Sequence, residues 1–301
     1  MKKTLITIFA LLLGFFIFDR VLEKGLWWLH EHSKFSDDKP YLYVANDVNS
    51  DFILMGASRT SHHFVPSIIE DSLLTTVYVA GFDGSPDIFF QYAILNLILK
   101  HHIPKIICLE MGYLVDGTSA NLPMLAPYIG QSEQIDSVFK DTKTFIDYQL
   151  SHVYRYNSCV LSNITGIIKN DAKGADIQGY RPLPSIKMGE ISQSKDFKVD
   201  SVAVRYLHKF INTCKQQNIQ LIFCASPWYV KPTPTQYDFL KLIAKDNHIP
   251  FLDYHTNGLF QDRKDIWKDA NHLSAKGAEL FSPIFAHDVK ALLISSGQMP
   301  E

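Results

Sequence analysis

The sequence predicts an α/β protein with a doubly wound, five-stranded parallel sheet and helices on both faces. Two observations predict this class. Short apolar runs of strand length alternate with segments of helical periodicity, and turns of small residues follow the first two runs. A third observation adds a membrane segment, because the chain begins with a long apolar stretch. With 301 residues and 47% hydrophobic content, the chain can bury a large core.

A membrane helix is predicted over residues 1–30. Lys2 and Lys3 precede an uncharged segment, residues 4–18, which is apolar apart from two threonines. The segment is shorter than the ~20 residues of an ideal span, so an uncleaved anchor and a cleaved signal peptide both fit. We favour the anchor, because no small-x-small cleavage site follows and a pair of tryptophans suits the membrane interface. The positive-inside rule then predicts a single-pass protein whose C-terminal domain lies outside the cytoplasm, in the periplasm or the extracellular space.

The rest of the chain predicts a linker and one domain with an insertion. The linker is predicted over residues 31–50, which are rich in polar and charged residues and contain a strand-like Tyr-Leu-Tyr-Val patch. The domain is predicted over residues 51–301. The five strands are expected at 52–55, 75–80, 105–110, 219–225 and 250–253. The core helices are expected at 65–74, 88–101, 199–217, 235–247 and 274–293. Residues 114–198 break the alternation and predict a helical insertion beside the sheet edge, with helices at 135–150 and 156–168.

A turn of small residues follows the first predicted strand and contains Ser58. Gly56 and Ala57 allow a sharp turn, and Thr60 and Ser61 can cap the helix that follows. Ser58 is therefore expected at the carboxyl edge of the sheet. Backbone N–H groups at a helix start stabilise anions, so this position suits the nucleophile of an acyl-transfer reaction.

A serine nucleophile needs a base, and the sequence Asp269-Ala-Asn-His272 supplies one before the final predicted helix. A spacing of three residues lets the carboxylate hold one ring nitrogen while the other faces outward. Two alternatives stay open at this point. Asp269 can cap the final helix, and His272 can be one of the twelve ordinary histidines of the chain.

Taken together, these segments resemble the SGNH (GDSL-like) hydrolase superfamily over about residues 50–295. Gly-Ala-Ser58-Arg resembles the first block of that family, and Gly81-Phe-Asp-Gly84 resembles the second. The Asp-x-x-His sequence that ends at His272 resembles the last block, and the three occur in the order of the family.

The resemblance implies a three-layer SGNH or flavodoxin-like fold and a role for each matching residue. It implies that Ser58 is the nucleophile, His272 the general base and Asp269 the residue that orients the base. Gly84 is the expected backbone donor to the oxyanion, ahead of Gly81. Subgroups that resemble this chain, with a membrane helix and Gly-x-Ser-Arg, include extracytoplasmic acyltransferase-like proteins that act on cell-surface polymers.

One departure from the family pattern concerns the third block. The family usually has an asparagine donor just after the third strand, whereas this chain has Glu-Met-Gly112 there. Losing one oxyanion donor can reduce the rate by about 10²–10³. Arg59, Tyr113 and Asn121 are the candidates to replace it. Glu110 is expected to accept hydrogen bonds from loop N–H groups rather than to act as an acid or base.

Arg59, Trp228 and Tyr229 are the candidate substrate-binding residues. The two aromatic residues follow the fourth predicted strand, where they can stack on a sugar ring or close the core. His62 and His63 lie one helical turn past the serine and can line the pocket. Adjacent residues on a helix do not face the same way, so a two-histidine metal site is not expected.

Composition argues against several other classes of function. Lys and Arg total 29 against 31 for Asp and Glu, and no long basic stripe is present, so a nucleic acid partner is not expected. The four cysteines have neither metal-type spacing nor the pattern of a disulfide framework. We therefore expect no metal and no cofactor.

The sequence thus predicts a membrane-anchored, outward-facing esterase or O-acyltransferase. Its expected substrate is an ester-linked acyl group, on an acylated carbohydrate of the cell surface or another ester. One alternative is a non-catalytic relative that binds a glycan or a partner protein at the same edge. Another is an assembly component of an envelope-polymer machine. The sequence implies no particular protein partner.

Overall fold

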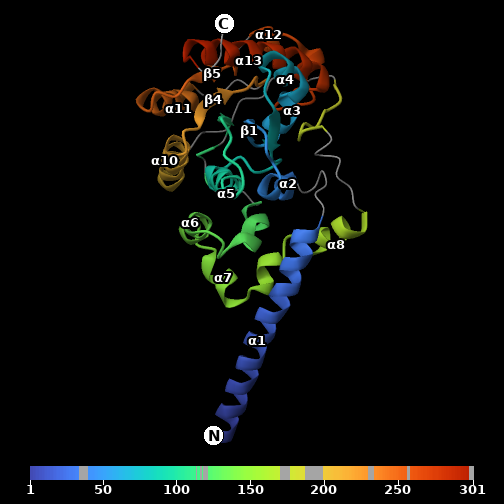
Figure 1. Cartoon of the computed structure of the whole chain (residues 1–301), viewed down its shortest axis with the longest axis vertical. Coiled ribbons are helices and arrows are strands. Elements are labelled where there is room, and N and C mark those ends of the chain that lie inside the picture. Colours follow the sequence, from blue (N-terminus) through green and yellow to red (C-terminus); the bar gives the residue numbers. More distant parts are fainter. Residues whose placement is uncertain are drawn as a thin grey trace. The chain divides into compact units, whose positions relative to one another are not determined.

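The structure is a computed structural model of the chain. It describes residues 1–33, 40–112, 114–115, 117, 121–169, 177–186, 199–229, 234–255 and 258–297. The chain divides into two compact units, which Figure 1 draws in one view. The first unit is Met1–Asp38 with Ala120–Ala172, and the second is Lys39–Ser119 with Lys173–Glu301.

The second unit contains a five-stranded sheet in which every pair of neighbouring strands is parallel. The strands are β1 (Phe52–Gly56), β2 (Val77–Gly81), β3 (Ile106–Glu110), β4 (Gln220–Ala225) and β5 (Phe251–Asp253). Their order is β2-β1-β3-β4-β5. The predicted α/β class and all five predicted strands are confirmed. The chain runs from β1 to one side for β2 and to the other side for β3, so the topological switch point, where such sheets bind ligands, lies beside β1.

Helices cover both faces of this sheet, which makes the predicted three layers (Figure 1). The helices of this unit are α2 (Pro40–Asn46), α3 (Ser58–His63), α4 (Pro66–Leu73), α5 (Ile88–Ile98), α10 (Ser201–Gln216), α11 (Pro234–Asp246), α12 (Gly258–Gln261), η3 (Lys264–Ile266) and α13 (Ala275–Ser295). On one face α4 packs against α13, and Phe285 of α13 stacks over Phe52 of β1. On the other face α5 packs against α10 and α2.

Residues 40–46 form helix α2, so the predicted strand-like patch in a linker is wrong. Pro40 begins the helix, where its fixed φ and missing N–H are tolerated. Tyr41, Leu42, Val44 and Ala45 are buried, and α2 packs against α5 and β2. The aromatic and β-branched composition suggested a strand, but burial of one helical face decided the outcome. The second unit therefore begins before residue 51.

The first unit is helical. It contains α1 (Lys2–His32), η1 (Leu122–Tyr128), α6 (Glu133–Asp141), α7 (Phe145–Leu150), η2 (Val153–Tyr156) and α8 (Val160–Lys169). The single helix predicted over 135–150 is split in two, because Lys143 adopts a left-handed conformation (φ 63°). The predicted insertion, 114–198, is divided between the two units. Residues 177–186 belong to the second unit, where the Gln178 carbonyl accepts a bond from Val79 N–H on edge strand β2 (2.9 Å). Residues 187–198 lie outside the described residues.

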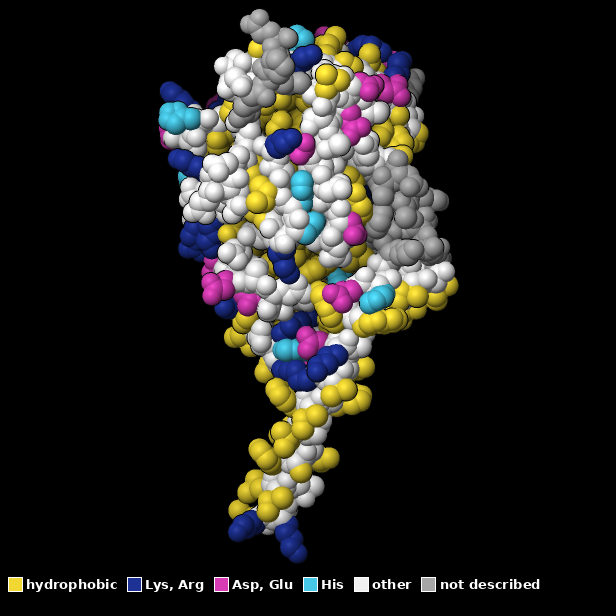
Figure 2. All heavy atoms as spheres, in the orientation of Figure 1, with side chains coloured by type: hydrophobic (Ala, Val, Ile, Leu, Met, Phe, Trp, Pro, Cys, Tyr) yellow, Lys and Arg dark blue, Asp and Glu magenta, His cyan; other side chains and the backbone are white. Residues whose placement is uncertain are grey.

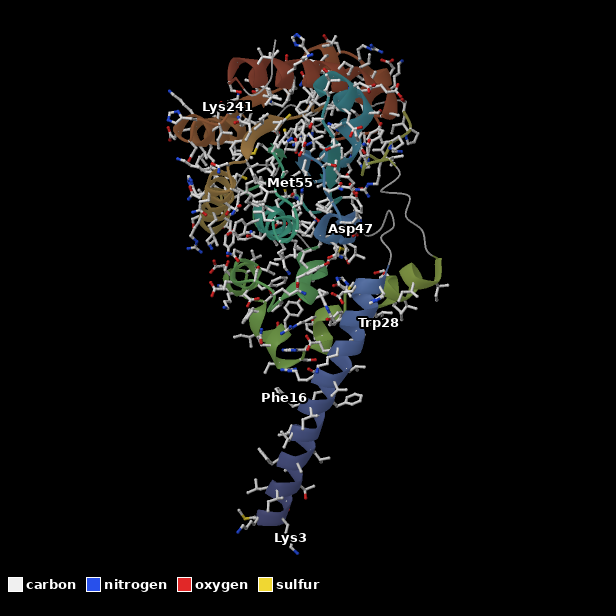
Figure 3. The ribbon with its side chains drawn as sticks, viewed as in Figure 1. Lys3, Phe16, Trp28, Asp47, Met55 and Lys241 are labelled. Carbon is white, nitrogen blue, oxygen red and sulfur yellow. The ribbon has the colours of Figure 1, made fainter. Side chains whose placement is uncertain are left out.

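The first half of α1 is exposed. Figure 2 shows apolar side chains along this part of the helix and lysines at its start, and Figure 3 labels Lys3 and Phe16 there. The helix is long and apolar enough to cross a membrane, and its apolar window is almost unburied in the structure. It is therefore an N-terminal apolar helix of the kind found in signal anchors and signal peptides.

Candidate active site

The turn after β1 places Ser58 at the carboxyl edge of the sheet, as the first residue of α3. Two hydrogen bonds to the Gly56 carbonyl hold this turn, from Phe82 N–H (3.0 Å) and from Gln91 Nε2 (3.1 Å). Gln91, buried in α5, also donates to the Ser85 carbonyl (3.0 Å). One side chain thus fixes the turn after β1 and the turn after β2. The prediction that Thr60 and Ser61 cap the helix is wrong, because both lie inside α3.

Ser58, His272 and Asp269 form a hydrogen-bonded line. His272 Nε2 lies 2.7 Å from Ser58 Oγ, and His272 Nδ1 lies 2.8 and 2.9 Å from the two carboxylate oxygens of Asp269. The carboxylate accepts from Nδ1–H, so Nε2 has its lone pair toward the serine hydroxyl. This is the geometry of a serine activated by a general base, and it brings together the three residues predicted from the sequence.

The local backbone holds the Asp269 carboxylate in its ionised form. Besides the imidazole, its Oδ1 accepts from the backbone N–H of Asn271 (2.8 Å) and of His272 (3.0 Å). Partial burial raises the pKa of Asp269, but the hydrogen bonds from His272 and Asn271 outweigh it and hold this pKa below its usual value. A carboxylate that stays charged can stabilise an imidazolium on His272. The alternative role of Asp269, as the cap of the last helix, is taken by Ser274, which accepts from Gly277 N–H.

The two candidate oxyanion glycines have different surroundings. Gly84 lines the pocket beside Ser58 and adopts φ 74° in the turn Phe82–Ser85, which is closed by a bond from Ser85 N–H to the Phe82 carbonyl (3.0 Å). A positive φ at the third position is the requirement of a type II turn, and glycine meets it without strain. Gly81 ends β2, and a side chain there would collide with Ser61. Gly81 is not among the described residues that line the pocket, so its small size serves packing against α3.

Arg59 and Glu110 form a buried ion pair in the pocket wall, with Arg59 Nη2 3.0 Å from Glu110 Oε1. The guanidinium lies over Gly112, since a side-chain carbon at that glycine would come within 2.7 Å of Arg59 Nη2. Arg59 also donates to Tyr237 Oη (3.3 Å) and faces the ring of Trp228 at 5.1 Å. The guanidinium thus lies beside the position where the resemblance expected an asparagine.

Glu110 accepts bonds from loop groups, as predicted. Its Oε2 accepts from Gly112 N–H (3.1 Å), and its Oε1 accepts from the Ser226 hydroxyl (3.0 Å). The Ser226 hydroxyl in turn accepts from His63 Nδ1 (3.1 Å), because Leu273 N–H donates to His63 Nε2 (3.0 Å) and makes that nitrogen the acceptor. Burial, with Arg59 as the next cause, holds the pKa of His63 well below its usual value. His63 is therefore a neutral structural residue behind the site.

Trp228 and Tyr229, predicted as a substrate-binding pair, have separate roles in the structure. Trp228 lines the pocket, and its indole Nε1 donates to Asn271 Oδ1 at 2.6 Å. Tyr229 is buried in the hydrophobic core and packs on Trp267, with ring centroids 5.5 Å apart. Of the two roles left open for these aromatic residues, Tyr229 closes the core, so its burial contradicts the prediction that it contacts substrate. Asn271 was not predicted, although its place inside the Asp-x-x-His sequence was a signal for it.

The pocket beside Ser58 is small. Its volume is about 130 Å³, below the roughly 300–1,000 Å³ of clefts for drug-sized ligands. Its lining residues are Ala57, Ser58, Arg59, Gly84, Pro86, Glu110, Gly112, Trp228, Asn271 and His272. Among the residues that the structure describes, no group of three His, Cys, Asp or Glu side chains could hold a metal ion. The site can therefore admit a small acyl group to a serine nucleophile.

Of the two further candidates for the missing donor, Asn121 is not among the described residues that line this pocket. Tyr113 lies outside the described residues. Asn121 belongs to the first unit. His62 packs edge to face against His272, with ring centroids 5.5 Å apart. Its Nδ1 is 2.6 Å from the Arg181 carbonyl and its Nε2 is 3.3 Å from Asp83.

Comparison with known proteins reveals a similarity among solved structures. No protein-family model matches the chain, and no curated protein does. Among solved structures, the chain is similar to the acetyl xylan esterase AlAXEase, with a TM-score of 0.41 and 12% sequence identity. The match covers 80% of this chain and 98% of that one.

Proposed function

We propose that this protein is an SGNH-like serine esterase or O-acyltransferase. The observation that supports it best is the hydrogen-bonded line from Ser58 Oγ through His272 to Asp269, with 2.7 Å between the hydroxyl oxygen and Nε2. A hydroxyl at this distance from a neutral imidazole can be deprotonated as it attacks.

The proposed reaction has two steps. Ser58 Oγ attacks the carbonyl carbon of an ester while its proton passes to His272 Nε2. The C–O bond to the alcohol then breaks, the alcohol takes that proton, and an acyl-Ser58 ester is left. Water or a sugar hydroxyl attacks this ester, again with His272 as the base, and frees Ser58. Asp269 stabilises the imidazolium in both steps.

The charge that develops on the carbonyl oxygen needs donors, and the pocket offers three. The backbone N–H groups of Ser58 and Gly84 are two of them, since Ser58 begins α3, where an N–H group has no partner within the helix, and Gly84 lines the same pocket. We assign the third to Arg59. Its guanidinium lies over Gly112, at the position where the family that this chain resembles has an asparagine. Glu110 and Trp228 hold the guanidinium at the pocket wall. A cationic donor is stronger than a neutral amide.

The substrate we propose is a small acyl ester, such as an acetyl group, on a carbohydrate. The pocket volume of about 130 Å³ suits a short acyl chain. Trp228 in the pocket wall offers an apolar contact to a sugar ring, and Asp83, with its partner His62 beside His272, offers a polar one. Helix α1 would hold the enzyme in the membrane with the second unit outside the cytoplasm, where cell-surface carbohydrates lie.

The test is ester hydrolysis by the full-length protein in detergent micelles. We expect the wild type to release acetate from an aryl acetate and from an acetylated oligosaccharide, and Ser58→Ala to release none above background. Added unacetylated oligosaccharide should accept the acetyl group if the enzyme is a transferase. Equal rates for wild type and a folded Ser58→Ala would contradict the proposal and leave a glycan-binding role at the same pocket.

A further inference from the structure

The uncharged apolar stretch of α1 is shorter than the hydrocarbon core of a bilayer. Residues 4–18 rise about 22 Å at 1.5 Å per residue, whereas the hydrocarbon core of a bilayer is about 30 Å thick. Asp19 and Arg20 follow directly. A short span is normally matched by local thinning or by flanking residues that enter the interface. Residues of the first unit that flank the span can supply such contacts with the interface.

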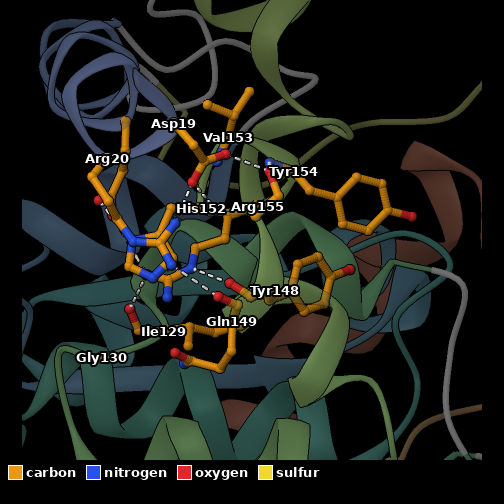
Figure 4. A network of polar contacts seen from close by, with 12 residues as sticks. Asp19, Arg20, Ile129, Gly130, Tyr148, Gln149, His152, Val153, Tyr154 and Arg155 are labelled. Carbon is orange, nitrogen blue, oxygen red and sulfur yellow. Dashed lines mark hydrogen bonds and ion pairs between the residues drawn. The ribbon is translucent and has the colours of Figure 1, made fainter. Parts of the chain in front are cut away.

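The first polar residues of α1 bind the segment between α7 and η2. The buried carboxylate of Asp19 accepts from the Ser151 hydroxyl (2.5 Å) and from the N–H of His152 (2.8 Å) and Val153 (3.3 Å). Arg20 donates to the Gln149 carbonyl (3.0 Å). Figure 4 shows this network. The network attaches residues 149–153 to α1 at Asp19 and Arg20, directly after the apolar stretch ends.

Exposed apolar side chains flank this attachment. Ile146 is 71% exposed, Leu150 is 72% exposed and Tyr154 is 48% exposed. Ile146 and Leu150 are four residues apart on α7, so they share one face of the helix. We call these three residues the α7 patch. An aqueous solvent would disfavour such exposure of large aliphatic side chains.

The charges at the same level are neutralised inside the unit. Glu23 lies 2.8 Å from His152 Nδ1 and 3.4 Å from Arg155 Nη1, and Asp19 pairs with Arg20. Pairing of these charges lowers the cost of bringing the patch into the headgroup region. Asp147, which is exposed on α7 next to Ile146, can remain in that polar region.

We propose that the α7 patch is a membrane-binding surface, which inserts into the outer interface of the same bilayer that α1 spans. The occupant is a lipid surface rather than a protein, because the patch is continuous with the end of the apolar stretch of α1 through the Asp19 attachment. A tyrosine beside two aliphatic side chains is also the composition of an interfacial anchor. Two contacts with the bilayer, α1 and the patch, would fix the rotation of the first unit about α1.

Helix α8 supplies the contrast within the same unit. Leu161 is 77% exposed, but α8 is attached to α1 through a bond from Asn163 to His30 Nδ1 (3.2 Å). His30 lies eleven residues beyond Asp19, which is about 16 Å further along the helix. Leu161 is therefore expected in water, although it is as exposed as Leu150.

The inference rests on the proposal that α1 is an uncleaved anchor, and one experiment tests both. The four native cysteines are buried, so a single exposed cysteine can be labelled selectively. Full-length Leu150→Cys and Leu161→Cys are labelled with an environment-sensitive fluorophore and reconstituted in nanodiscs of phosphatidylcholine and phosphatidylglycerol. Quenching is then measured with a nitroxide lipid and with aqueous iodide.

We expect the nitroxide lipid to quench the label at position 150 at least about threefold more than the label at position 161, with the reverse order for iodide. Ile146→Cys should behave like Leu150→Cys. Equal lipid quenching at 150 and 161, or full iodide access at 150, would overturn the inference while α1 still held the protein in the disc. Recovery of a soluble chain shortened near residue 20 would overturn the anchor itself. Neither result bears on Ser58, so ester hydrolysis tests the proposed chemistry separately.

Discussion

The carboxyl edge of the sheet holds two Asp–His pairs, and their surroundings differ. Asp269 and His272 lie in the loop before α13, and the second ring nitrogen of His272 faces Ser58. Asp253 and His255 lie at the end of β5, where Asp253 contacts both His255 Nδ1 and Lys241. The ring of His255 lies on Tyr237, with centroids 4.3 Å apart.

The difference lies in what each aspartate is bound to. Burial raises the pKa of Asp253, but its bonds from His255 and Lys241 outweigh this and lower the pKa to about 2. That carboxylate already has a full cationic partner, so it gains little from an imidazolium. Asp269 has backbone N–H donors and His272 instead, so its charge can support a proton on His272.

The group that faces the second ring nitrogen of the histidine therefore decides the role of an Asp–His pair. Among the bonds recorded for the described residues, His272 contacts a serine hydroxyl, whereas His255 contacts its own aspartate and an aromatic ring. The pairs are nevertheless linked. Tyr237 lies on His255 and accepts from Arg59, so the second pair supports one wall of the pocket.

The largest expected effect is the loss of Ser58 or His272. Ser58→Ala and His272→Ala should each lower kcat for an aryl acetate by about 10⁴-fold or more, because the two residues act in one proton transfer. The double variant should be little slower than either single variant. Steady-state hydrolysis checks this, with circular dichroism as the control for folding. Additive losses in the double variant would mean that the residues do not share a step.

Replacement of the two aspartates tests the comparison itself. Asp269→Asn should lower kcat by about 10²–10⁴ because the imidazole loses its tautomer and its counter-ion. Asp253→Asn, the matched control, should change kcat by no more than about threefold. A greater loss in Asp253→Asn than in Asp269→Asn would reverse the roles assigned to the pairs.

Arg59→Lys tests the link between the pairs and should have a smaller effect. Lysine keeps the charge but loses the planar fork that contacts Glu110 and Tyr237, so kcat should fall by about 10–100-fold with little change in KM. Arg205→Lys on the exposed face of α10 is the control and should leave both constants unchanged. A change in KM alone would make Arg59 a substrate-binding residue instead.

The smallest effect is on stability in acid. The folded pKa of Asp253 is about 2, below its ordinary value of 3.8, so its contribution to folding is present above about pH 4 and is lost as the pH falls toward 2. The contribution is roughly 2–3 kcal/mol before solvent screening, since the pKa falls from 3.8 to about 2 and one pKa unit corresponds to about 1.4 kcal/mol. Urea unfolding between pH 5 and pH 2.5 should show a loss in the wild type that is smaller in Asp253→Asn. Parallel curves would mean that the carboxylate gains nothing on folding.

The sequence predicted the sheet and the Asp269–His272 pair from local patterns, whereas the link from that pair to Ser58 came from the resemblance to a known family. The five strands are short apolar runs, and Asp269 and His272 are close in the chain. The helix at 40–46 and the orientation of Tyr229 could not be predicted, because they depend on which face packs against a distant helix or ring. The contact of Arg59 with the space over Gly112 joins α3 to the loop after β3, which are far apart in the sequence, so only the folded structure reveals it.

The most direct test of the account is covalent labelling of Ser58 by a fluorophosphonate. The hydroxyl of an ordinary serine does not react with such a reagent, whereas one activated by a neighbouring imidazole does. We predict that the full-length protein gains the mass of one phosphonyl group, that peptide mapping places it on Ser58, and that His272→Ala lowers the labelling rate by about 10³-fold or more. Asp253→Asn should label at the wild-type rate. An unlabelled wild type, or a His272→Ala variant labelled as fast as the wild type, would contradict the central claim that His272 activates Ser58.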